Sequence, residues 1–254
     1  MILCVDLENR YTNFGVFHAD TLIHNFKVKT DISRSSDELY IMIKLILEDL
    51  KVDLTKIKDI IISSVVPDFL HTLKNISYRL INKEAIVVGV GVRTGLKVRC
   101  ENPKEVGTDR IIRGVGALSE YDSPLIIVNL SHFSTVDVIN DKNEFIGGLI
   151  FPGINIANEG MYLESATLPK VELVKPKNVI GNRTVTAMQS GLYYQYLFSI
   201  DSVIDRVLEE LNLDATIILT GTFVNFLKNE LKHECIVDPF IGFKGLKRIY
   251  ELNS

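Results

Sequence analysis

The fold of this chain is decided first by the stretch MILCVDLENR, residues 1–10. Its apolar first half predicts a buried strand, and the polar residues from Asp6 onward predict a turn at the end of that strand. The stretch LIIVNLSHFST, residues 125–135, repeats this pattern. Turns of this kind present polar side chains and backbone amides to a nucleotide phosphate and its metal ion, so we expect both turns to lie at a phosphate site.

Strands and helices alternate in a particular order through the first half of the chain. Strands are predicted at Met1–Val5, Phe14–His18 and Leu22–Val28, and they are joined by hairpin turns. Ser35–Glu38 then begins a helix with an N-cap. The segments after it are a strand that starts at Asp59 and runs into a turn ended by Pro67, a helix at Asp68–Lys83 and a strand at Ala85–Val88. This order predicts an antiparallel meander that leads into two parallel strands with helical crossovers.

The second half repeats that order. Its predicted elements are strands at Leu125–Asn129, Ser134–Asn140 and Phe145–Phe151, helical segments at Asn155–Thr167 and Thr184–Leu211, and a strand at Ala215–Leu219. Such a duplicated unit is similar to the sugar kinase, heat-shock and actin superfamily, which has an α/β fold with two ribonuclease H-like domains around a cleft. We therefore expect an N-terminal actin-like domain at residues 1–115 and a C-terminal actin-like domain at residues 116–254, hinged near residues 113–120.

Composition excludes several other classes of protein. The 254 residues carry a net charge of -4 without a clustered basic surface, which argues against direct binding to nucleic acid. The three cysteines lack any C-x-x-C spacing, so neither a zinc knuckle nor a disulfide framework is expected. No apolar stretch approaches the ~18–20 residues of a membrane span. We expect a cytoplasmic protein without a membrane partner.

A set of short motifs runs along the chain in one order. They are Ser63–Pro67, Thr94–Leu96, Asn102–Arg110, Gly147–Ile154, Leu168-Pro169, Thr184–Gly191 and Ile249–Asn253. In this order they resemble the type III pantothenate kinase family, and the resemblance covers essentially the whole chain. It implies ATP-dependent phosphorylation of pantothenate to 4'-phosphopantothenate, the first step of coenzyme A synthesis. It also implies a homodimer that needs Mg²⁺ and a monovalent cation, K⁺ or NH₄⁺.

The resemblance assigns roles to the segment before and after Gly107. Asp109 is the implied general base that takes the proton of the pantothenate hydroxyl, and Arg110 and Gly107 are implied to hold the substrate. Cys100 stands where the family usually has a tyrosine that contacts the substrate. A carboxylate suits the role of base because it can accept a proton within hydrogen-bond reach. Considered without the motif, Asp109 and Arg110 are also compatible with an ordinary ion pair at a helix N-terminus.

The resemblance also implies a nucleotide and metal site. Asp6 matches the family's first acid, at the end of the first strand, and Asn9 follows in the same turn. The other implied nucleotide positions are Asn129, Ser131, His132 and Thr184, with Asp6 and Asn129 at the metal ion.

The first turn departs from the family's pattern, D-x-G-N-T or D-x-G-N-S. Glu8 replaces the glycine, and Arg10 replaces a small hydroxyl residue. Glycine lets a turn adopt positive φ and lets backbone amides approach phosphate, whereas Glu8 adds a side chain and a negative charge. Arg10 offers a new phosphate contact in one interpretation, and in the other it is captured by Glu8.

The second turn departs further, from D-x-G-T-A-T-T. Asn129 replaces the acid and Ser131 replaces the glycine. An amide can offer one oxygen to a metal ion but brings no charge. His132 is compatible with a replacement acid or base and with a structural histidine. The family's T-G-G and Y-G-Y segments become Thr220-Gly221-Thr222 and Tyr194-Gln195-Tyr196.

Three hypotheses follow from this pattern. The chain is a working pantothenate kinase with unusual phosphate loops, or it is an impaired, pseudokinase-like member that pairs with an intact paralogue. In the third hypothesis it is a non-catalytic binding or regulatory protein, because the family also resembles Bvg accessory factor. The acidic composition would then require a protein partner and not DNA.

Overall fold

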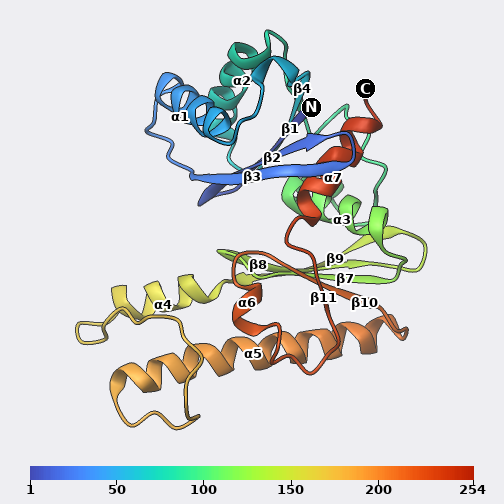
Figure 1. Ribbon diagram of the computed structural model, residues 1–254. Helices are drawn as coiled ribbons and strands as arrows, with labels where there is room; N and C mark the ends of the chain where they lie inside the picture. The colour runs from blue at the N-terminus through green and yellow to red at the C-terminus, as the bar shows by residue number, and fades with distance from the viewer. The chain divides into compact units, whose positions relative to one another are not determined.

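The structure, a computed structural model, describes residues 1–254 and divides the chain into two units (Figure 1). Unit 1 comprises Met1–Leu96, Glu101–Glu120 and Phe240–Ser254. Unit 2 comprises Lys97–Cys100 and Tyr121–Pro239. Each unit contains one β-sheet. None of the helices combines the length and the apolar character that a membrane span requires.

The sheet of unit 1 has the predicted order of strands. It consists of β1 (Ile2–Leu7), β2 (Tyr11–His18), β3 (Thr21–Lys29), β4 (Asp59–Ser64) and β5 (Ile86–Val87). In space these strands run β3-β2-β1-β4-β5. The pairs β1–β2 and β2–β3 are antiparallel, while β1–β4 and β4–β5 are parallel. The meander and the crossover predicted from the sequence are both confirmed.

Helices cover both faces of this sheet (Figure 1). The helices of one face are α1 (Ser36–Asp49) and α2 (Pro67–Ile81), and a short 3-10 turn at Leu54–Lys56 precedes β4. Alternate β1 residues such as Leu3 and Val5 pack into the core that these helices cover. Ser35 caps α1 as predicted, since its hydroxyl accepts a hydrogen bond from the Glu38 amide at 3.3 Å.

Two helices that are far apart in the sequence cover the other face. They are α3 (Thr108–Glu120), which follows a 3-10 turn at Pro103–Glu105, and α7 (Ile241–Glu251). Their backbones cross closely: a Cβ built on Gly116 would lie 2.0 Å from the Ile241 carbonyl oxygen, and one on Gly245 would lie 1.8 Å from that of Ile112. This packing places the last helix in unit 1, which differs from the predicted division into residues 1–115 and 116–254. Residues 113–120, the predicted hinge, continue α3.

Unit 2 repeats the sheet of unit 1 and adds an edge strand. Its strands are β6 (Lys97–Val98), β7 (Leu125–Asn129), β8 (Phe133–Ile139), β9 (Glu144–Pro152), β10 (Thr216–Thr220) and β11 (Ile236–Val237). They run β11-β10-β7-β8-β9-β6. The series β9-β8-β7-β10-β11 therefore corresponds to β3-β2-β1-β4-β5 in unit 1. The extra strand, β6, pairs parallel to β9.

The helices of unit 2 are α4 (Ile154–Leu163), α5 (Thr184–Leu211) and α6 (Val224–Leu227). The segment Thr184–Leu211 is one continuous helix, whereas the sequence was compatible with one long or two short helices. The helix predicted at Asn155–Thr167 ends earlier, at Leu163. The apolar side of α5 packs on the sheet through residues such as Leu197 and Ile200.

Candidate functional site

The carboxyl ends of β1 and β4 bring polar side chains together in unit 1. Asp6 is in register with Ser63 across the parallel pair. Thr108, at the start of α3, joins this edge: its hydroxyl donates to the Ser64 carbonyl oxygen at 2.9 Å and accepts from the Ser64 amide at 3.2 Å. Ligands of open α/β sheets bind at the carboxyl ends of the strands. The fold thus places the start of α3, with Asp109, at such an edge.

Asp109 lies in the first turn of α3 and is paired with Arg113 one turn later. Arg113 Nη2 donates to Asp109 Oδ2 at 2.6 Å, and the Arg113 side chain is only 4% exposed. Although burial alone would raise the pKa of Asp109, the charge and hydrogen bond of Arg113 hold it below its usual value. Asp109 is therefore an ionised carboxylate, which is the form that accepts a proton.

Gly107 lies directly against the Asp109 carboxylate. A Cβ built on Gly107 would be 2.5 Å from Asp109 Oδ1, so any other residue would have to move that carboxylate. The amide of Arg110 donates to the Gly107 carbonyl oxygen at 3.0 Å, which helps to start the helix. The predicted general base, Asp109, and two of the predicted substrate-binding residues, Gly107 and Arg110, are thus neighbours at the start of α3.

Asp6 and Glu8 share this region with Asp109. Burial raises the pKa of Asp6 well above its usual range, and the charges of Glu8 and Asp109 raise it further. Asp6 Oδ1 is buried and has no hydrogen-bond partner. Burial also raises the pKa of Glu8, despite the opposing charge of Arg113. An unpaired buried carboxylate oxygen is the kind of atom that a cation would satisfy, so Asp6 fits the predicted metal position.

The turn after β1 is closed without positive φ. The Glu8 amide donates to the Tyr11 carbonyl oxygen at 3.1 Å, and the Thr30 hydroxyl donates to the Glu8 carbonyl oxygen at 2.8 Å. None of the residues with positive φ lies in this turn. The turn therefore accommodates Glu8 without the backbone strain that a glycine position would impose. The predicted residue Asn9 is exposed at its tip.

The turn after β7 in unit 2 is neutral. Asn129 is buried, and its side-chain oxygen Oδ1 accepts a hydrogen bond from the Ser131 hydroxyl at 2.8 Å. Gly221 packs against this pair with φ +99°, and a Cβ there would lie 2.6 Å from both Asn129 Oδ1 and the Leu130 carbonyl oxygen. The side-chain oxygen of Asn129 thus uses one lone pair for a hydrogen bond within the turn, and the amide brings no negative charge. It fits a cation poorly.

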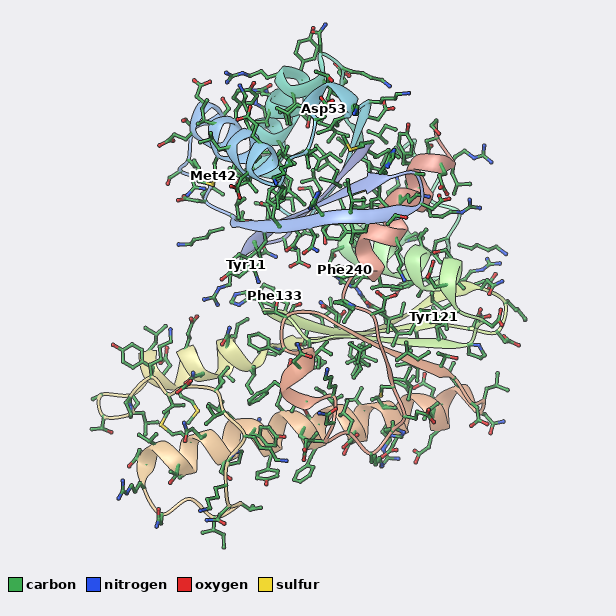
Figure 2. The ribbon with its side chains drawn as sticks, in the orientation of Figure 1. Tyr11, Met42, Asp53, Tyr121, Phe133 and Phe240 are labelled. Atoms are coloured by element: carbon green, nitrogen blue, oxygen red, sulfur yellow. The ribbon has the colours of Figure 1, made fainter.

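Other residues that the motifs of unit 2 singled out lie in this turn, as His132 does, or in other segments, as Tyr196 and Cys100 do. His132 packs edge-to-face against Phe133, with ring centroids 5.1 Å apart. The Phe133 side chain, labelled in Figure 2, is 47% exposed. Tyr196, from the altered Y-G-Y segment, is buried in the core and hydrogen-bonds Ser134. Burial raises the pKa of Tyr196 to about 12. Cys100 follows β6 as a free, partly buried thiol.

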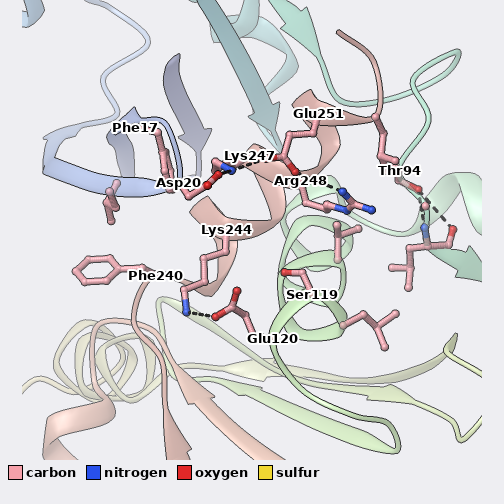
Figure 3. Close-up of a pocket in the computed structure, with 16 residues that line it drawn as sticks. Phe17, Asp20, Thr94, Ser119, Glu120, Phe240, Lys244, Lys247, Arg248 and Glu251 are labelled. Carbon is pink, nitrogen blue, oxygen red and sulfur yellow. Dashed lines mark hydrogen bonds and ion pairs between the residues drawn. The ribbon is translucent and has the colours of Figure 1, made fainter. Parts of the chain in front are cut away.

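Two hollows lie apart from these turns. Thr184 lines a cavity of about 770 Å³ beside the start of α5, together with residues such as Met161, Leu168 and Gln195. In unit 1 a cavity of about 720 Å³ lies along α3 and α7 (Figure 3). Its cations are paired: Lys244 reaches Glu120 at 2.8 Å and Lys247 reaches Asp20 at 2.6 Å. Neither Asp6 nor Asp109 lines that cavity.

Sequence reasoning missed Arg113. The signal was present, because Asp109 and Arg113 are four residues apart on a helix and such residues face each other. Without the structure, however, nothing indicated that this arginine is buried or that it also lies 3.8 Å from Glu8.

Comparison with known proteins relates this chain to one family along its whole length. The family model described as type III pantothenate kinase matches residues 2–206. The type III pantothenate kinase of Exiguobacterium sibiricum is 38% identical over 254 residues, which is 100% of both chains. That of Bacillus cytotoxicus is 38% identical over 100% of this chain and 97% of its own length.

Solved structures of other proteins resemble the fold of this chain. A Campylobacter jejuni protein assigned to the Baf family of transcriptional activators has a TM-score of 0.61 at 21% identity, covering 99% of this chain and 98% of its own. A Porphyromonas gingivalis protein assigned as an N-acetylglucosamine kinase has a TM-score of 0.54 at 12% identity, with 100% of each chain covered. Together with the repeated sheets, these likenesses confirm the predicted α/β, duplicated actin-like fold. The identity along its whole length shows that the chain belongs to the type III pantothenate kinase family.

Proposed function

We propose that this chain binds pantothenate and retains the proton acceptor for its phosphorylation by ATP, but transfers phosphate weakly on its own. One observation carries the proposal. The Asp109 carboxylate is held ionised at the carboxyl edge of the unit 1 sheet, whereas the corresponding turn of unit 2 has lost its charge at Asn129. The relatives' names supply the substrate class, because they are type III pantothenate kinases.

The residues of unit 1 would act on the substrate hydroxyl. Asp109 would accept its proton, while Arg113 fixes the carboxylate and Gly107 leaves room for it. Phosphoryl transfer otherwise requires mainly positioning and neutralisation of charge. The residues at this edge therefore suit the proton-accepting half of the reaction.

The two residues that would hold a metal ion, Asp6 and Asn129, are not equally suited to that role. Asp6 would bind Mg²⁺ through its unpartnered Oδ1. Bound Mg²⁺ would neutralise phosphate charge. Asn129, with its oxygen engaged by Ser131, would bind neither Mg²⁺ nor K⁺ or NH₄⁺ well. Losing one charge-stabilising group typically costs about 100–1000-fold in rate, which is why we infer impaired turnover.

We further propose that the chain works as a homodimer or pairs with an intact paralogue. Apolar side chains exposed on β9 and at the start of β8 support a partner surface in unit 2: they are Ile146, Leu149, Ile150 and Phe133. An intact paralogue would supply a charged second turn that this chain lacks.

The test is to measure pantothenate binding by calorimetry and phosphorylation by ATP with the purified chain. We expect pantothenate to bind and 4'-phosphopantothenate to form slowly, at a rate that an intact paralogue increases. Rapid turnover by the chain alone would contradict the impairment. Failure to bind pantothenate would refute the proposal and favour the alternative, a non-catalytic binding or regulatory protein.

A further inference from the structure

Arg113 faces two carboxylates that come from distant parts of the sequence. Its Nη2 donates to Asp109 Oδ2 at 2.6 Å, and its Nη1 lies 3.8 Å from Glu8 Oε1. The Arg113 side chain is 4% exposed. Because a guanidinium is planar and its donors are fixed in direction, the orientation that serves one carboxylate also restricts the other. Arg113 therefore connects the start of α3 with the turn after β1.

The surroundings of Arg113 are strongly acidic. The carboxyl groups of Asp6, Glu8 and Asp109 meet here, from β1, the following turn and α3, and the charges of Glu8 and Asp109 raise the pKa of Asp6. The positive charges that act on these acids come from Arg113, from Arg110 on α3 and from Lys27 on β3. A buried charge is costly once its partner is removed. The buried Arg113 is thus expected to restrict the positions of both Glu8 and Asp109.

We propose that Arg113 is the positioning residue for Asp109 and that Glu8 is its second anchor, so that the turn after β1 and the proton acceptor are held as one unit. The inference deepens the proposed function and rests on it for the role of Asp109, while the Glu8–Arg113–Asp109 bridge itself can be measured without turnover. Glu8 then has a partner in the fold, and Glu8→Gly alone would remove one of the two carboxylates that Arg113 faces.

The bridge is tested by a double-mutant cycle in urea unfolding. The variants are Glu8→Gln, Arg113→Gln and the two combined, with Arg206→Gln as a matched control, because Arg206 is 81% exposed and pairs with Glu209 on the surface. Glu8→Gln removes one carboxylate that Arg113 faces, and Arg113→Gln removes the cation that Glu8 faces. Because the second substitution finds the interaction already gone, the combined variant should lose less stability than the sum of the single losses. Additive losses would overturn the bridge. Arg206→Gln should change stability little.

The positioning role is tested on Asp109 itself. The carboxyl ¹³C signal of Asp109, assigned through its disappearance in Asp109→Asn, should move in Arg113→Gln and return part of the way in Arg113→Lys. Where turnover is measured, Arg113→Gln should lower kcat by about 100-fold, the typical effect of a displaced catalytic group, with the KM for Mg-ATP unchanged. An unmoved Asp109 signal would overturn the role. If the variants show these NMR shifts but the wild-type chain neither binds nor phosphorylates pantothenate, only the proposed function is refuted.

Discussion

The turn after β1 in unit 1 and the turn after β7 in unit 2 occupy the same place in two copies of one topology, but their chemistry differs. Asp6 is in register with Ser63, and Asn129 is in register with Thr220. Around Asp6, carboxylates surround a buried arginine. Around Asn129, a neutral amide is satisfied by a serine hydroxyl. The strand order decides where these side chains lie, whereas their identity decides which ligand they can hold.

The two turns show that a departure from the family's motif is compensated elsewhere in the fold in one case, at Glu8, and is left uncompensated in the other, at Asn129. At Glu8 the added acid lies near a buried guanidinium, so the change is matched elsewhere in the fold. At Asn129 the lost acid is replaced by a local hydrogen bond that restores no charge. If turnover is impaired as proposed, we therefore expect the turn of unit 2 to be the main cause.

The largest expected effect comes from restoring the turn of unit 2. Asn129→Asp, Ser131→Gly and His132→Thr together should raise pantothenate phosphorylation by about 100–1000-fold, because they return a charged group and open the backbone. Asn129→Asp alone should return little, since residues of one site act as a unit. Changing only the unit 1 turn with Glu8→Gly and Arg10→Thr should give no gain, because Glu8 is one of the two carboxylates that Arg113 faces. A gain there larger than that from unit 2 would reverse the comparison.

The next effect compares two glycines, Gly221 beside the turn of unit 2 and Gly107 beside Asp109 in unit 1. Gly221→Ala should destabilise the protein by about 1–3 kcal/mol, because φ is +99° and the new Cβ would meet a backbone carbonyl. Gly107→Ala meets only the Asp109 carboxylate, so it should weaken pantothenate binding with less loss of stability. Urea unfolding and calorimetry on both variants measure this. Equal stability losses would contradict the assignment.

The pH dependence of stability should differ in sign between two acids of unit 1. The folded pKa of Asp6 is raised by burial, so its ionisation costs stability as pH rises above the usual carboxyl range. Asp6→Asn should then stabilise the protein at neutral pH, and the gain should vanish in acid.

Asp109 behaves in the opposite way. Burial opposes ionisation, but Arg113 lowers the folded pKa, so the stability that the carboxylate contributes at neutral pH is lost as pH falls through that pKa. Asp109→Asn should destabilise at neutral pH and matter less in acid. Urea unfolding across this pH range tests both variants, and the same sign for both would contradict the electrostatics.

The smallest effect concerns single hydroxyl groups. Ser131→Ala removes one hydrogen bond to Asn129 and should cost about 0.5–1.5 kcal/mol. Thr108→Val should cost more, because that hydroxyl bonds both the amide and the carbonyl of Ser64. Thermal unfolding of the two variants gives the comparison. A larger loss of stability in Ser131→Ala than in Thr108→Val would contradict this ranking.

Much of the fold could be predicted because its signals are local. The apolar run before Asp6 and its repeat before Asn129 identified the central strands, and the Ser35 cap identified the start of α1. The assignment of the last helix to unit 1 could not be predicted, since it depends on the close crossing at Gly116 and Gly245 between distant segments.

The candidate site was predictable only in part for the same reason. Gly107, Asp109 and Arg110 are contiguous, so one motif found them. The proximity of Glu8 to Arg113 joins a turn to a helix far along the chain, and no local pattern encodes it. The hydrogen bond between Ser131 and Asn129 likewise depends on the conformation of the turn.

Calorimetry of the purified chain with Mg-ATP tests the central claim most directly. The neutral turn at Asn129 predicts a Kd weaker than about 1 mM, and the variant Asn129→Asp/Ser131→Gly/His132→Thr should bind at least about tenfold more tightly, a gain of about 1.4 kcal/mol. A wild-type Kd in the low micromolar range would contradict the proposal that the neutral turn at Asn129 weakens the binding of Mg-ATP.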